Sequence, residues 1–201
     1  MQSISLSIKA LCTARVGHSF RQKPDCIDAG NVLLIQPKDV TSNGILDAST
    51  LCRSNLPVEK RLNAGDVLLI NRGRFTACVF DGTIKEPCIA TSAFLIFTPK
   101  DQSQLLPEYL VLFFNSAEGQ HLFKRLTMTT TISFITLGHL ESIEIPLPSI
   151  ERQRALATFG ELNKAYLRLS SRKAELQKQI VWAGLVSAPL CLSNKGVPWP
   201  K

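Results

Sequence analysis

Short apolar blocks alternate with turn-forming residues over the first three quarters of the chain. Apolar runs occupy residues 32–35, 67–70, 77–80 and 93–97, and each has Gly, Pro, Asn or Asp within two residues of at least one end. Runs of this length between turn formers are buried strands more often than helices. The pattern therefore predicts a strand-rich region.

A helical pattern interrupts these strands. Pro107 and Glu108 suit a helix start, and apolar residues at 109, 110 and 112–114 supply one face. A second helical stretch is expected over residues 120–126, a β-prone or loop-like segment over 127–131, and a short strand over 143–148. The predicted fold class is α+β, with a mixed, strand-rich domain over residues 1–148.

The pattern changes after Pro148. Ser149 is a good N-cap, although Arg152 stands where Glu or Gln would complete a capping box. No proline occurs from 150 to 187, and two series of residues repeat every seven positions: Phe159, Tyr166, Lys173 and Ile180, and Leu162, Leu169, Leu176 and Ala183. This heptad seam predicts one long coiled-coil helix over residues 149–187, about 50 Å long, and an irregular tail over 188–201.

The heptad seam has two interpretations. An apolar stripe usually packs on the core of its own domain. The length of the helix and the seven-residue repeat instead favour a partner helix. We prefer the partner helix and expect the eight seam residues to form a dimer interface.

Composition and charge indicate a folded, basic protein. Hydrophobic residues make up 45% and charged residues 19%, the net charge is +7 and the pI is about 9.3. Excess Lys and Arg favour a polyanionic partner, nucleic acid first and an anionic membrane second, although many basic proteins only carry solvated basic faces. No apolar run is long enough to span a membrane, and residues 1–12 lack the apolar segment of a signal peptide. We expect a cytoplasmic protein without a membrane partner.

The residue types that enzymes need are scattered. The six cysteines form no CxxC pair and no zinc spacing with a His, so we expect no metal site and reduced, cytosolic thiols. The sequence contains no GxGxxG, P-loop, HExxH or GxSxG motif, and no Pro-Pro dipeptide for the base-holding loop of an adenine methyltransferase. A catalytic site is therefore not predicted.

Four basic segments are candidates for DNA contact, because Lys and Arg bind phosphates and Arg reads guanine. Arg72 and Arg74 flank a glycine after a predicted strand, for which a solvated turn is an equal alternative. Lys124 and Arg125 precede a run of hydroxyls, for which the alternative is an ordinary basic helix end. The complete set is Arg72 and Arg74; Lys124, Arg125, Thr129 and Thr130; Lys60 and Arg61; and, as the weakest group, Arg15, His18 and Arg21.

The motifs also occur in a characteristic order. They are residues 30–35 with 38–40, residues 62–69 (LNAGDVLL) followed by Arg72 and Gly73, residues 107–110 and 113–116 with Gly119, and residues 140–153 (LESIEIPLPSIERQ). In this order, over nearly all of residues 15–185, the chain resembles the specificity (S) subunits of type I restriction–modification systems. The last run, which leads into the long helix, is the most specific.

The resemblance implies a non-catalytic subunit with a mixed α/β recognition domain on a conserved-region helix. It implies that the partners are double-stranded DNA and a modification subunit, which carries the adenine methyltransferase and its S-adenosylmethionine, so that this chain holds no cofactor. A restriction subunit can add ATP-driven cleavage. The resemblance does not imply which base each residue reads.

The sequence departs from the family pattern in one respect. A full S subunit has two recognition domains and two antiparallel helices that read the halves of a split site, whereas this sequence holds one of each and no internal repeat. The resemblance then implies a half-length form, an antiparallel homodimer that reads a split palindrome. Three alternatives stay open: pairing with a different S-like chain, a stand-alone DNA-binding or methyltransferase-binding regulatory (decoy) protein, and an enzyme with an unfamiliar site.

Overall fold

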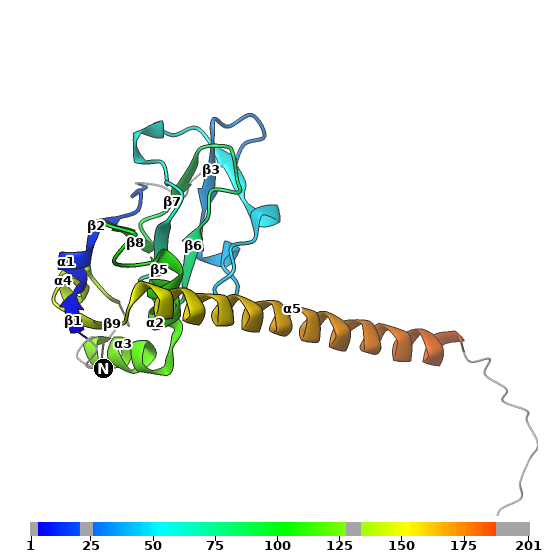
Figure 1. Ribbon diagram of the computed structural model, residues 1–201. Helices are drawn as coiled ribbons and strands as arrows, with labels where there is room; N and C mark the ends of the chain where they lie inside the picture. The colour runs from blue at the N-terminus through cyan, green and yellow to red at the C-terminus, as the bar shows by residue number, and fades with distance from the viewer. Residues whose placement is uncertain (1–3, 21–25, 128–133, 188–201) are drawn as a thin grey trace, which may run out of the picture. The chain divides into compact units, whose positions relative to one another are not determined.

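The computed structural model describes residues 4–20, 26–127 and 134–187, with side chains up to Ala183 in the last range (Figure 1). The chain divides into two compact units, Met1–Gly160 and Glu161–Lys201. Every sheet in the described ranges lies in the first unit. The mixed, strand-rich domain followed by a long helix confirms the predicted α+β fold class.

A four-stranded antiparallel sheet organises the first unit. Its order is β2 (Cys12–Val16), β8 (Phe94–Pro99), β5 (Asp66–Ile70) and β6 (Ala77–Phe80). All residues of β5 are buried, because both faces of the sheet are covered. Val67 and Leu69 belong to one hydrophobic core, and Leu68 and Ile70 belong to a second, as the alternation of side chains along a strand requires.

Helices and a small sheet enclose the first of these cores. They are α1 (Ile8–Leu11), α2 (Pro107–Asn115), α3 (Ala117–Thr127), α4 (Leu137–Glu141) and the antiparallel pair β1 (Ile4–Ser7) and β9 (Glu144–Leu147). The ring of Phe114 lies with its centroid 5.4 Å from that of Phe97 and 5.7 Å from that of Phe123. The Tyr109 hydroxyl donates to the Pro146 carbonyl at 2.7 Å, which ties α2 to β9.

A three-stranded sheet packs against the second core. Its order is β4 (Cys52–Ser54), β3 (Val32–Ile35) and β7 (Cys88–Ala90), with β3 antiparallel to β4 and parallel to β7. Ile35, Cys88 and Ala90 join the core formed by Leu68 and Ile70. The short 3-10 helices η1 (Pro37–Asp39), η2 (Ala48–Thr50) and η3 (Val58–Lys60) lie in the connections.

One pair of cysteines differs from the sequence expectation. Cys26 and Cys52 form a disulfide, with Cα atoms 5.4 Å apart, so the prediction of reduced thiols is wrong for this pair. The Ile27 amide donates to the Arg53 carbonyl at 2.9 Å, and this contact brings two segments together that lie far apart in the sequence. Cys12, Cys78 and Cys88 are buried, as small hydrophobic residues would be.

The long C-terminal helix, α5, runs over Ile150–Ser187 and confirms the predicted long helix. The Ser149 carbonyl accepts the Gln153 amide at 2.9 Å, which closes the first helical turn. Backbone N–H bonding and the Ser149 hydroxyl lower the pKa of the Glu151 carboxyl, as expected in the first turn of a helix. The predicted tail over residues 188–201 lies outside the described residues. Of the helices that the structure describes, none could cross a membrane.

Candidate nucleic-acid interface

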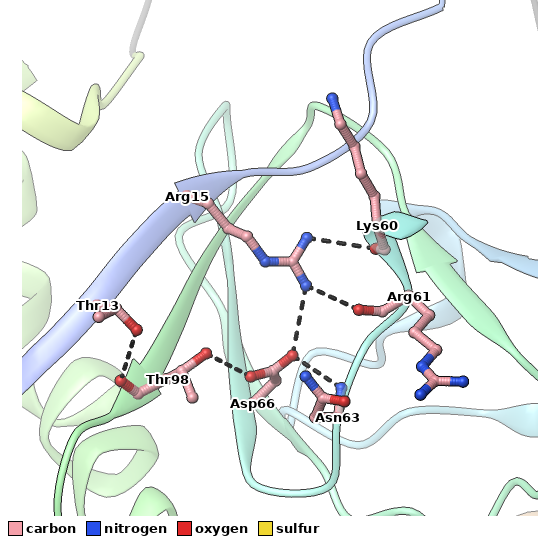
Figure 2. A network of polar contacts seen from close by, with 7 residues as sticks. All are labelled: Thr13, Arg15, Lys60, Arg61, Asn63, Asp66 and Thr98. Carbon is pink, nitrogen blue, oxygen red and sulfur yellow. Dashed lines mark hydrogen bonds and ion pairs between the residues drawn. The ribbon is translucent and has the colours of Figure 1, made fainter. Parts of the chain in front are cut away.

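A polar network holds the loop that precedes β5 (Figure 2). The Asp66 side chain is fully buried, and its carboxylate accepts hydrogen bonds from the Thr98 hydroxyl at 2.5 Å and the Asn63 amide at 3.0 Å. The Arg15 guanidinium forms an ion pair with this carboxylate at 3.5 Å. Buried charges require such partners, so the structure explains the Asp66 of the motif over residues 62–69 by its role in holding this loop.

Arg15 is itself part of this network. Its guanidinium also donates to the Lys60 carbonyl at 3.3 Å and to the Arg61 carbonyl at 3.1 Å. Figure 2 shows the side chains of Lys60 and Arg61 pointing away from Arg15, and both residues are exposed. Of the predicted contact residues in this region, Arg15 therefore supports the loop, while Lys60 and Arg61 present their cations to solvent.

The two arginines of the turn after β5 have different surroundings. Gly73 adopts φ 73°, a left-handed conformation that favours glycine. The Arg72 guanidinium lies 5.2 Å from the centroid of the Phe134 ring and is exposed. The Arg74 guanidinium donates to the Pro37 carbonyl at 3.3 Å and to the Val40 carbonyl at 2.5 Å. Arg72 is therefore the more available of the two for a ligand.

The other predicted contact residues are divided between described and undescribed segments. Lys124 and Arg125 are exposed in the last turn of α3, where cations are favoured by the helix dipole. Thr129, Thr130 and Arg21 lie outside the described residues. These assignments stay predictions.

His18 lies where β2 meets the turn between β7 and β8. Its amide donates to the Ala90 carbonyl at 2.7 Å, and its ring centroid lies 4.8 Å from that of Phe20. The Nδ1 atom is buried and has no hydrogen-bond partner among the described residues. The contacts of His18 that the structure shows are therefore made within the domain.

A surface pocket that the sequence did not indicate adjoins the Lys60 and Arg61 segment. It has a volume of about 280 Å³ and is lined by Arg61, Asn63, Gly82, Lys85 and Glu86, among others. Its polar residues come from two loops far apart in the sequence. Lys85 was missed because an isolated lysine in a loop carries no local signal.

The heptad seam of α5 is open to solvent in the described chain. Phe159, Tyr166 and Leu169 are 70%, 68% and 72% exposed, and Ile180 is 70% exposed. Lys173 and the remaining seam positions are exposed as well. Val181 and Trp182, which the heptad pattern did not include, add exposed apolar area next to Ile180. Exposed apolar area on this scale indicates an interaction surface.

In the part of the chain that the structure describes, the possible metal ligands do not cluster, and Cys12 and Cys88 are buried. No group of three His, Cys, Asp or Glu side chains is arranged to hold a metal ion there. Burial raises the pKa of the Cys12 thiol to about 12 and that of Cys88 to about 11. Thiols of this kind are poor nucleophiles at neutral pH, because the thiolate is the reactive form.

A family model described as the type I restriction modification DNA specificity domain matches residues 5–161. The chain matches no curated protein.

Solved structures show the same fold. One is from work on the assembly and conformational transition of the type I R-M system, with a TM-score of 0.66 and 19% identity over 90% of this chain and 43% of that chain. Others are the HsdS subunit from Thermoanaerobacter tengcongensis (TM-score 0.60, 18% identity, 85% of this chain and 39% of that one) and the S subunit from M. genitalium (TM-score 0.60, 15% identity, 89% and 43%). This chain thus spans less than half the length of each.

Proposed function

This chain belongs to the type I restriction modification DNA specificity domain family, and we propose from this that it recognises a DNA site and directs a partner adenine methyltransferase to it. The family is the non-catalytic, DNA-recognising component of these systems. The partner supplies S-adenosylmethionine and the methyl transfer, and a restriction subunit is an optional third component. Because the target is DNA, the expected compartment is the cytoplasm.

The observation that carries the proposal is the family match over residues 5–161. One feature of the structure supports it. Basic residues are exposed at both ends of the central strand β5: Lys60 and Arg61 precede it, and Arg72 follows it. Lys and Arg at such positions supply phosphate contacts and base contacts.

The finer part of the proposal is that the chain acts as an antiparallel homodimer through α5 and reads a split, palindromic site. It is supported by the exposed heptad seam, in which Phe159, Leu162, Tyr166, Leu169 and Ile180 are all at least 65% exposed. Apolar seams of this repeat are buried against a partner helix in coiled coils. A two-fold dimer reads a site with two-fold symmetry.

Light scattering of the purified chain tests the dimer. Wild type should be dimeric, and the Leu169→Lys/Leu176→Lys variant should be monomeric, because each substitution places a charge in the seam. Ser171→Lys adds one lysine outside the seam and should leave the dimer intact. A monomeric wild type would remove the homodimer, and co-purification with a different S-like chain would replace it.

Selection from a random duplex library, with and without the methyltransferase, tests DNA recognition. We expect enrichment of a split palindrome, strongest when the methyltransferase is present. Binding to the methyltransferase without enrichment of any sequence would instead favour a regulatory protein that occupies the enzyme. Methyl transfer or cleavage by the chain alone would assign it as an enzyme.

A further inference from the structure

The pocket beside Arg61 has a charge imbalance that suits an anion. Arg61 is exposed, and its guanidinium makes no hydrogen bond or ion pair with any residue that the structure describes. The Lys85 ammonium donates to the Gly82 carbonyl, at 3.4 Å. The Glu86 carboxylate, which also lines the pocket, is paired with Arg53 at 2.5 and 2.9 Å. Arg61 and Lys85 therefore line a pocket in which the carboxylate of Glu86 is already engaged.

The side of the pocket that carries Arg61 is fixed to the central sheet. Arg15 binds the carbonyls of Lys60 and Arg61, and Asp66 accepts the Asn63 amide (Figure 2). Between these points the Leu62 amide donates to the Cys88 carbonyl at 2.8 Å. The backbone of this loop is thus held by hydrogen bonds at each of residues 60–63, so the Arg61 side chain extends from a fixed position.

We propose that this pocket binds a phosphate of the DNA backbone through Arg61 and Lys85, and that Arg15 is a positioning residue that holds Arg61 in place. The inference rests on the proposed function, since it assumes that the chain binds DNA. A planar guanidinium with a fork of N–H donors matches a phosphate, and a lysine adds a point charge. Such a contact adds affinity without reading sequence.

Fluorescence anisotropy with a random-sequence 30-base-pair duplex, across a series of salt concentrations, tests the pocket. Arg61→Ala and Lys85→Ala should each weaken binding by about tenfold. Each should also lower the slope of log affinity against log salt by about 1. Lys9→Gln removes one positive charge from α1, where Lys9 already pairs with Glu141 at 3.3 Å, and should leave the slope nearly unchanged.

A double-mutant cycle tests the positioning role. Arg15→Lys keeps the charge but loses the fork that binds two carbonyls, so it should weaken DNA binding several-fold in the wild-type chain. It should have no further effect in the Arg61→Ala/Lys85→Ala chain. Thermal unfolding of every variant monitors folding. Equal losses in both backgrounds would show that Arg15 acts independently of Arg61 and Lys85, which would overturn its positioning role.

The outcomes separate this inference from the proposed function. A wild-type chain that binds no duplex, alone or with the methyltransferase, would contradict the proposed function. Duplex binding with an unchanged salt slope in both alanine variants would contradict the pocket alone. In a last experiment, the wild-type chain is titrated with inorganic phosphate and with a mononucleotide. If both bind the pocket tightly while the variants still bind duplex normally, the pocket is a small-anion site and the proposal is wrong.

Discussion

At the scale of single residues, exposure does not distinguish an arginine that binds a ligand from one that supports the fold. Arg72 and Arg74 are both exposed and only two positions apart. Arg74 binds the carbonyls of Pro37 and Val40, whereas Arg72 lies over the Phe134 ring. The sequence places them in one motif, and the structure shows that their contacts differ.

Arg72→Ala and Arg74→Ala should therefore behave differently. Arg72→Ala should cost about 1–3 kcal/mol of DNA binding if Arg72 reads a base, with little change in the free energy of unfolding. Arg74→Ala should lower the free energy of unfolding by about 1 kcal/mol, because it releases two backbone carbonyls. Anisotropy and urea unfolding measure the two effects. Identical profiles for the two variants would refute this division.

The buried thiols give a prediction about pH. Burial raises the pKa of Cys12 from 9.0 to about 12, so the folded state favours the protonated thiol. The resulting stability is complete below pH 9 and is lost as the pH rises from 9 towards 12, because only the unfolded chain then releases the proton. Cys12→Ser should flatten this alkaline decline in urea unfolding. A decline of unchanged steepness would assign it to other groups.

Burial also lowers the chemical reactivity of these thiols. At pH 8 the Cys12 and Cys88 thiols should react slowly with a thiol reagent in the native protein and rapidly in guanidinium chloride. Absorbance of the released chromophore measures both rates. Cys12→Ser and Cys88→Ser variants identify each site, and rapid labelling of either thiol in the native protein would contradict the assignment.

At the scale of elements, α5 is anchored at its start by one buried amide. Gln153 is 0% exposed; its side chain donates to the carbonyls of Gln104 at 2.7 Å and Pro148 at 3.0 Å, and accepts the Leu106 amide at 3.0 Å. These bonds join the first turn of α5 to the residues that precede α2. The glutamine of the motif over residues 140–153 thus has a structural explanation.

Gln153→Ala should be strongly destabilising. It leaves buried backbone groups without partners, and we expect a loss of about 2–4 kcal/mol in the free energy of unfolding by urea. Gln177→Ala is a matched control, since Gln177 is exposed on the same helix. A Gln153→Ala protein as stable as this control would show that water replaces the lost bonds.

Elements with a strong local pattern could be predicted from the sequence. The runs at 32–35, 67–70, 77–80 and 93–97 correspond to β3, β5, β6 and β8. The start of α2 at Pro107 was also predicted correctly, whereas α3 begins at Ala117, earlier than expected. The four-residue α1 and the three-residue strands β4 and β7 were missed, because such short elements are set by tertiary contacts and not by periodicity.

The candidate site could be predicted only in part. Basic residue types and turn positions indicated Lys60, Arg61 and Arg72. The role of Arg15 could not be found, because its partners lie 45 to 51 positions away in the sequence. The same holds for the Cys26–Cys52 pair and for the pocket, whose two loops come together only in the folded sheet.

At the scale of the whole molecule, the proposed homodimer predicts a defined stoichiometry on DNA. A duplex with the complete palindrome should bind two protomers, and a duplex with one half-site should bind far more weakly, because the second contact is intramolecular only on the full site. Mass photometry measures the complexes. The Leu169→Lys/Leu176→Lys variant should bind both duplexes with similar, weak affinity. Tight binding of one wild-type protomer to a half-site would contradict the dimer as the reading unit.

The length of the central strand sets the distance between two basic loops. β5 is buried at every position, and the basic loops with Arg61 and Arg72 leave from its two ends. A strand advances about 3.3 Å per residue, so five residues span about 17 Å, which is close to five base-pair steps of B-DNA. In the proposed complex, β5 sets the distance between the contacts of Arg61 and Arg72, and lengthening the strand would shift one contact against the other by a fraction of a helical turn.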